Sequence, residues 1–293
     1  MTYGEELKEK LFSKKTNGWL KLSDELKKEI FDYNDNYMKF LNESKTEREI
    51  VTSAKKIAEE NGFKDINEVE HLNVGDKVYY INKEKSMYLA VIGEEKMENG
   101  VNIIGSHADS PRLDLKPNPV YEDQELAYFK THYYGGIKKY QWTTIPLSIH
   151  GVIIKENGEK VTIKIGEDEN DPIFTITDLL PHLAVEQQNS KLREAIKGKD
   201  LNLLVGSIPF DEDIAENVKL NLLNILNKKY GIVEKDFSSA ELEVVPAFKC
   251  RTLGLDESLI AGYGQDDKVC VYTSLRAILN IENPKRTAVC LFS

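Results

Sequence analysis

Hydrophobic and polar positions along the first hundred residues predict helices followed by strands. Thr46 and Glu49 have the spacing of a capping box, and apolar residues follow at i, i+4, i+7 and i+8: Ile50, Ala54, Ile57 and Ala58. This pattern predicts a helix of about four turns that ends near Gly62. Residues 77–93 then predict two short strands, and residues 100–109 predict a third, buried strand. Helices beside such strands indicate the beginning of an α/β layer.

The middle of the chain has a different pattern. Apolar positions alternate over residues 152–165 on both sides of Asn157-Gly158, a strong hairpin signal. Helical pieces are expected at 177–188 and 211–231, the second with an apolar stripe of Ile214, Val218, Leu222, Ile225 and Leu226. A β-rich block that interrupts an α/β pattern indicates an inserted domain. We therefore expect an α/β domain in two segments, 1–117 and 246–293, separated by an inserted β-rich domain at 118–245.

The last part of the chain returns to the α/β pattern. Residues 241–250 are a strand candidate, and residues 261–281 predict a loop that runs into a helix. Asp266 and Asp267 fall at the expected N-terminus of that helix, and its apolar stripe is Val271, Leu275, Ile278 and Leu279. Residues 286–293 predict one more buried strand.

Composition excludes several classes of partner. The 293 residues carry 39 Lys and Arg against 49 Asp and Glu, a formal charge of −10 without a basic stripe. Nucleic acid and anionic membrane surfaces are therefore not expected partners. The chain has no run of 18 apolar residues and begins with charged residues, which predicts a cytoplasmic protein. Cys250, Cys270 and Cys290 are widely spaced and are expected to be buried thiols in a reducing compartment.

Two pairs of residues are candidates for metal chemistry. His107 and Asp109 follow the strand expected before them, and residues two apart in an extended chain point the same way. The pair suits a metal ligand with its orienting carboxylate, or else a loop histidine hydrogen-bonded by its neighbour. Asp266 and Asp267 suit either a site beside the same layer or simple capping of the helix. A single site formed by both pairs is the stronger interpretation, because both pairs lie beside predicted strands of one layer.

The other histidines are weaker candidates. We expect His71 and His150 at the surface of a loop or strand, His132 within an aromatic patch, and His182 inside a helical stretch. Each is expected to be structural. The patch of Tyr133, Tyr134, Tyr140 and Trp142 is expected either to form an assembly surface or to fill the core of the insert.

Four segments resemble one known family: GSHADSPRLDLKPNP, YYGGIKKYQWTTIPLSIHG, TDLLPHLA and GYGQDDKVCVYTSL. In this order and spacing they resemble the aspartyl aminopeptidase and aminopeptidase I family of dinuclear zinc metallopeptidases. The resemblance covers nearly the whole chain. It implies an α/β catalytic domain interrupted by a β-rich assembly domain, dodecamers built from dimers, and removal of the N-terminal residue from peptide substrates.

The resemblance also implies roles for single residues. His107 would be a ligand of one zinc, Asp109 the carboxylate that orients it, and Asp267 the carboxylate that bridges two zinc ions per subunit in a complete chain. Many members have Asp-Asn at the last site, whereas this chain has Asp267-Lys268 preceded by Asp266, so Asp266 is the alternative bridge. Two zinc ions polarise the scissile carbonyl and lower the pKa of a shared water.

The resemblance departs from the family pattern at its end. In the family a Glu-Glu pair that holds the general base and a zinc ligand follows the strand matching residues 286–293, and further aspartate and histidine ligands come later. None of these falls within residues 1–293, so we expect the chain to lack part of the active site and to bind zinc weakly. The alternative function is that of a non-catalytic assembly or regulatory protein that retains the fold.

Overall fold

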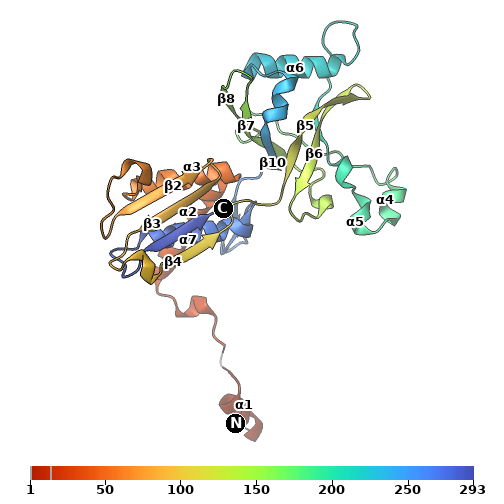
Figure 1. Cartoon of the computed structure of the whole chain (residues 1–293). Coiled ribbons are helices and arrows are strands. Elements are labelled where there is room, and N and C mark those ends of the chain that lie inside the picture. Colours follow the sequence, from red (N-terminus) through yellow and green to blue (C-terminus); the bar gives the residue numbers. More distant parts are fainter. Residues whose placement is uncertain (1, 14) are drawn as a thin grey trace.

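A computed structural model describes residues 2–13 and 15–293. The chain forms two main sheets, which lie in separate parts of the molecule and are joined near the N-terminus of α3 (Figure 1). The α-helices are α1 (Tyr3–Leu11), α2 (Asp24–Glu43), α3 (Glu47–Glu60), α4 (Val185–Asn189), α5 (Leu192–Ala195), α6 (Asn217–Tyr230) and α7 (Gln265–Leu279). Short 3₁₀ helices lie at Gly18–Lys21, Ile66–Glu68, Met97–Asn99, Lys139–Gln141, Gly198–Asp200 and Glu234–Ser239.

The first sheet has five strands in the order β1-β2-β3-β13-β4. Their bounds are β1 (Lys64–Asp65), β2 (Lys77–Asn82), β3 (Ser86–Val91), β4 (Asn102–Ser106) and β13 (Ala288–Phe292). Strand β13 pairs antiparallel to β3 and parallel to β4. The last strand in sequence is therefore inserted between two that lie close together along the chain. The strands predicted at 77–93 and 286–293 are confirmed.

Helices α2, α3 and α7 cover this sheet (Figure 1). The predicted capping box at Thr46 and Glu49 is present at the start of α3, and Ile50, Ala54 and Ala58 are buried. All four members of the predicted α7 stripe are buried against the same core. The helical periodicity of these two segments is thus explained by burial of one face.

The second sheet has six strands in the order β8-β7-β10-β5-β6-β9. Their bounds are β5 (Arg112–Asp123), β6 (Leu126–Tyr134), β7 (Leu147–Ile154), β8 (Lys160–Ile165), β9 (Leu203–Gly206) and β10 (Glu241–Pro246). A separate short hairpin joins β11 (Arg251–Leu253) to β12 (Leu259–Ala261). The predicted hairpin at Asn157-Gly158 is confirmed by the antiparallel pairing of β7 with β8. The second sheet has its own buried core, which includes Trp142.

Three helical predictions are wrong in part. Of residues 177–188, only those from Val185 onward are helical. Pro181 has no backbone N–H to donate, so it disfavours a helix that continues through it from residue 177. Helix α6 begins at Asn217, so Ile214 lies outside it and is exposed. Ile225 lies on α6 but is exposed, whereas Val218 is buried. The stripe predicted from periodicity is therefore wider than the face that α6 buries.

Strand β4 was expected to be buried, and this expectation is wrong. It is the edge strand of its sheet, and Ile103 and Ile104 are exposed. Only Ser106, its last residue, is buried. An apolar run does not by itself distinguish a central strand from an edge strand.

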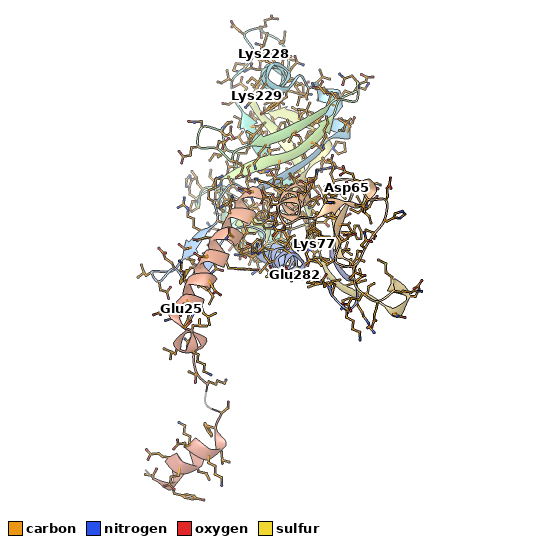
Figure 2. All side chains as sticks on the ribbon, turned by 90° about the vertical axis from the view of Figure 1, so that its left-hand side faces the viewer. Glu25, Asp65, Lys77, Lys228, Lys229 and Glu282 are labelled. Carbon is orange, nitrogen blue, oxygen red and sulfur yellow. The ribbon has the colours of Figure 1, made fainter. Side chains whose placement is uncertain are left out.

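Helix α1 stands apart from both sheets (Figure 1). It carries a capping box at Thr2 and Glu5, but it has no buried residue. Helix α2 projects beyond the body at its N-terminal half, where Glu25 is labelled (Figure 2), and it buries only Tyr37, Phe40 and Leu41 near its C-terminus. Among the described helices none is long and apolar enough to cross a membrane.

Candidate metal centre

The loop that follows β4 holds the first candidate pair. Parallel pairing with β13 places Ser106 opposite Phe292, and the Ala108 N–H donates to the Ser293 carbonyl at 2.7 Å. Ala108 is fully buried, whereas His107 and Asp109 point away from that core. The Nδ1 atom of His107 lies 3.2 Å from Oδ1 of Asp109. The predicted convergence of these two side chains is therefore present, although both lie beyond the end of the strand.

The second candidate pair lies opposite, at the start of α7. Nε2 of His107 is 3.6 Å from Oδ2 of Asp267 and 4.0 Å from Oδ1 of Asp266. The Asp267 side chain is 19% exposed and the Asp266 side chain is 93% exposed. The structure thus brings the two pairs together across the sequence and favours Asp267 as the residue that faces His107.

Local structure explains how α7 presents these aspartates. The helix is preceded by Gly264 at φ 78°, and no side chain caps it. Asp266 and Asp267 have non-helical backbone angles, and the Ser110 hydroxyl donates to the Asp266 carbonyl at 3.0 Å. The alternative role of Asp266 and Asp267 as the N-cap is therefore not observed. Through this hydrogen bond, Ser110 instead connects the loop after β4 to the start of α7.

Lys268 follows Asp267 at the start of α7, and its burial was not predicted from the sequence. Its side chain is fully buried, and its ammonium donates to the Lys45 carbonyl at 2.8 Å and lies 4.5 Å from the centre of the Tyr263 ring. Burial lowers the pKa of Lys268 to about 7. A lysine next to an aspartate gives no sequence signal for burial, because charged residues are usually exposed.

Tyr134 also reaches this site. Partial burial acts to raise the pKa of Asp109, but hydrogen bonds with Tyr134 and His107 hold that pKa below its usual range. The same hydrogen bond to Asp109 raises the pKa of Tyr134. The lowered pKa means that Asp109 is ionised at neutral pH. A carboxylate 3.2 Å from Nδ1 favours the tautomer with the proton on Nδ1, which leaves Nε2 of His107 free to bind a metal ion.

The three cysteines do not share one environment, so the expectation of buried thiols is wrong for two of them. Cys290 is buried, Cys250 is half-buried, and Cys270 is exposed. Cys270 lies on the second turn of α7, where a hydrogen bond to Asp267 raises the pKa of its thiol. Val271, the next residue, belongs to the buried stripe, whereas Val269 and Cys270 are exposed.

His150 was expected at the surface and is instead buried, with 1% exposure. Its Nδ1 lies 2.8 Å from Oε1 of Glu49, and its Nε2 lies 3.0 Å from Oε1 of Glu167. These partners connect the two sheets, and none of them belongs to the candidate metal centre. His71 is exposed, as expected, and His132 is exposed and stacks on Tyr133. His182 is exposed in a turn before α4, so its expected place inside a helical stretch is wrong.

The donor set fits a zinc ion in part. Zinc bonds of about 2.0–2.2 Å at a tetrahedral angle place two ligand atoms about 3.4 Å apart, close to the 3.6 Å between His107 and Asp267. An imidazole nitrogen with a carboxylate partner on its other nitrogen is a common zinc ligand. Within residues 2–13 and 15–293, no group of three or more His, Cys, Asp or Glu side chains is arranged to hold a metal ion.

Comparison with known families is consistent with this geometry. The family model for aminopeptidase I zinc metalloprotease (M18) matches residues 40–292. A probable M18 family aminopeptidase 1 from Clostridium acetobutylicum is 50% identical over 280 residues, which cover 94% of this chain and 60% of the relative. The corresponding protein of Thermotoga maritima is 47% identical over 266 residues, 91% of this chain and 58% of the relative.

Solved structures resemble the whole fold. The M18 family aminopeptidase of Thermotoga maritima superposes with a TM-score of 0.90 at 45% identity, covering 96% of this chain and 61% of that one. Aminopeptidase I of Clostridium acetobutylicum gives a TM-score of 0.88 at 45% identity, with 96% and 63% covered. A yeast mApe1 dodecamer shares the fold with a TM-score of 0.64 at 19% identity, over 88% of this chain and 59% of that chain. The chain thus spans about 60% of the length of the relatives it matches.

Proposed function

Because the chain belongs to the aminopeptidase I (M18) family of zinc metalloproteases, we propose that it supplies one side of the active site of an aminopeptidase. The reaction is removal of the N-terminal residue from peptides. The observation that carries the proposal is the approach of His107 to Asp267 from segments 160 positions apart, at 3.6 Å, within a fold shared with M18 aminopeptidases.

The residues of this chain have distinct roles in the proposal. His107 binds one zinc ion through Nε2, and Asp109 orients it through Nδ1. Asp267 would hold zinc through its carboxylate and would be the ligand shared by two ions, while Asp266 is exposed at the edge of the site. Zinc, when bound, polarises the scissile carbonyl and lowers the pKa of water at the site.

The remaining ligands and the general base are proposed to come from outside residues 1–293. A catalytic zinc ion takes three protein ligands and a water. His107 and Asp267 supply two donors at this site, and the described residues contain no group of three or more that could hold a metal ion. The relatives are longer, which supports the proposal that further sequence completes the site. The alternative is a non-catalytic assembly or regulatory protein that retains the fold.

Two further properties belong to this proposal. Residues of about 118–245 form an assembly domain, supported by exposed Leu179, Leu180, Leu183, Val185 and Leu192 around α4 and α5. This part of the chain is proposed to build a large homo-oligomer, a dodecamer by family resemblance. The protein is proposed to be cytoplasmic, and its free cysteines suit a reducing compartment.

The test uses a chain extended to the length of its relatives. His107→Ala and Asp267→Ala should each abolish hydrolysis of leucine and aspartate anilides, because each removes a direct ligand. Circular dichroism and melting temperature should remain those of the parent. Near-normal turnover by either variant at full metal occupancy would contradict the proposed ligands. No turnover by the extended parent itself would favour the non-catalytic alternative.

A further inference from the structure

An apolar cavity of about 530 Å³ lies between α6 and the second sheet. Strands β6, β7, β8 and β9 form one side of it, and one face of α6 forms the other. Phe129, Ile149 and Ile165 line it from the sheet, and Leu222 and Leu226 line it from the helix. A cavity of this volume with a mainly apolar lining is typical of sites for small organic ligands.

Helix α6 is fixed at both ends, which keeps the cavity open. Near its N-terminus, the Lys219 N–H donates to the Glu122 carboxylate of β5 at 2.9 Å. At its C-terminus, the N–H of Gly231, at φ 65°, donates to the Asn227 carbonyl at 2.7 Å, and the Asn227 side chain donates to the Ile232 carbonyl at 3.1 Å. Ile232 is buried in the core of the second sheet. A movement of α6 toward the sheet would break these contacts, so the cavity is part of the folded state.

The cavity leaves apolar side chains of α6 incompletely covered. Leu222, Leu226 and Tyr230 follow one another at intervals of four residues and pack against the core of the second sheet, but each is only half-buried. Ile173 and Ile225, which also line the cavity, are 59% and 52% exposed. An apolar ligand between α6 and the sheet would remove this surface from water, which favours binding.

A single positive charge stands beside this apolar surface. Among the described residues that line the cavity, Lys229 alone is charged. In Figure 2, where α6 is seen nearly along its axis, Lys229 lies on the side that faces the sheet and Lys228 on the outer side. Asp171 acts on the charge of Lys229, but its carboxylate already accepts from the Gly166 N–H at 3.0 Å. In a chain with a net charge of −10, this arrangement favours a ligand with an apolar body and one carboxylate.

We propose that the cavity binds a small amphipathic carboxylate, with its apolar chain between α6 and the second sheet and its carboxylate beside Lys229. Burial of the chain supplies most of the affinity, and the exposed ion pair orients the ligand and adds less. The cavity shares no residue with the candidate metal centre, so the inference is independent of the proposed function.

The first test varies the charge at the cavity. Titration calorimetry with decanoate, below its critical micelle concentration, should show saturable binding at one site by the 293-residue chain. Lys229→Gln should weaken decanoate binding about two- to fivefold and leave the binding of decanol unchanged, because only decanoate carries a charge. Lys228→Gln is the matched control, since Lys228 does not line the cavity, and it should bind both compounds as the parent does.

The second test fills the cavity. Leu222→Trp should abolish binding of both compounds, whereas Leu220→Trp should not, because Leu220 is 37% exposed and lies outside the lining. Circular dichroism checks that each variant is folded, and the charge variants alone decide if Leu222→Trp is not. Absence of saturable decanoate binding by the parent, equal affinities in the parent and Lys229→Gln, or full binding by folded Leu222→Trp would overturn the proposal. Binding that disappears as light scattering reports larger oligomers would show that a second copy covers the cavity instead.

Discussion

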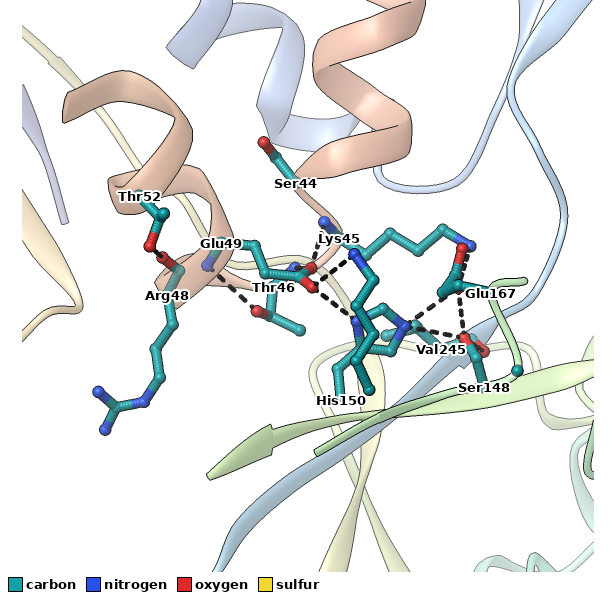
Figure 3. Close-up of polar contacts among 12 residues, drawn as sticks. Ser44, Lys45, Thr46, Arg48, Glu49, Thr52, Ser148, His150, Glu167 and Val245 are labelled. Carbon is teal, nitrogen blue, oxygen red and sulfur yellow. Dashed lines mark hydrogen bonds and ion pairs between the residues drawn. The ribbon is translucent and has the colours of Figure 1, made fainter. Parts of the chain in front are cut away.

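Lys45 and Glu167 form a buried ion pair that joins the two sheets, with Nζ of Lys45 2.7 Å from Oε1 of Glu167 (Figure 3). Lys45 precedes α3, and Glu167 follows β8. Glu167 also accepts from the Ser148 hydroxyl at 2.8 Å and lies 3.0 Å from Nε2 of His150. With Lys249 at 3.2 Å from Oε2, this carboxylate has four partners, and it helps to fix the position of the first sheet relative to the second.

Removal of that carboxylate should destabilise the protein strongly. Glu167→Ala leaves the buried Lys45 ammonium and His150 without their shared acceptor, which is expected to cost about 3–5 kcal/mol. Urea unfolding followed by tryptophan fluorescence measures the change. Glu159→Ala is the control, because its ion pair with Lys155 is exposed and should contribute about 0–1 kcal/mol. Equal effects of the two variants would show that the buried pair has no special role.

His150 should make stability depend on pH. Burial disfavours its charged form, but hydrogen bonds with Glu167 and Glu49 outweigh this and raise its pKa above the ordinary value. A raised pKa means that the stabilisation is complete below about 6.5, the unfolded value, and is lost as pH rises through the folded pKa. Denaturation of the parent and of His150→Gln between pH 5.5 and 9 provides the measurement, and the difference between the two should shrink with rising pH. A constant difference would contradict the assignment.

Zinc binding should distinguish the two aspartates. Asp267→Ala is expected to weaken zinc binding by residues 1–293 at least about tenfold, because a direct ligand is removed. Asp266→Ala should leave the affinity unchanged, since its side chain is 93% exposed and lies further from His107. Titration calorimetry with zinc alone compares the two variants with the parent. The reverse order of effects would make Asp266 the ligand.

The unmodified 293-residue chain is expected to bind zinc weakly and to lack peptidase activity. Two direct donors cannot hold two zinc ions that share one bridging carboxylate. Metal analysis of the purified chain, beside a chain extended to the length of its relatives, tests this expectation. Two zinc ions per subunit with comparable turnover in the shorter chain would show that the remaining ligands lie within residues 1–293.

Exposed leucines around α4 and α5 should control assembly. Leu180 is 60% exposed and Leu183 is 63% exposed, so charges at both positions should disrupt an apolar contact between subunits without disturbing the core. Light scattering of the double variant Leu180→Asp and Leu183→Asp should report a smaller species than the parent. Leu255→Asp is the control, because Leu255 is fully exposed in the loop between β11 and β12. An unchanged large oligomer in the double variant would exclude this surface.

Much of the local structure could be predicted from the sequence. Capping and apolar periodicity place α3 between Thr46 and Glu60, because these signals act between residues three and four positions apart. The β7–β8 hairpin followed from alternation around Asn157-Gly158 for the same reason. The spacing of His107 and Asp109 likewise predicted that their side chains meet. Each of these features depends on neighbours along the chain.

Tertiary structure decided the properties that depend on distant partners. Insertion of β13 between β3 and β4 left β4 at the edge, and only that pairing shows that Ile103 and Ile104 are exposed. The burial of His150 and Lys268 required acceptors more than a hundred residues away. The tertiary structure also decided which aspartate faces His107. The backbone conformation at the start of α7 turns Asp267 toward His107 and leaves Asp266 exposed, and the sequence Asp-Asp does not show this difference.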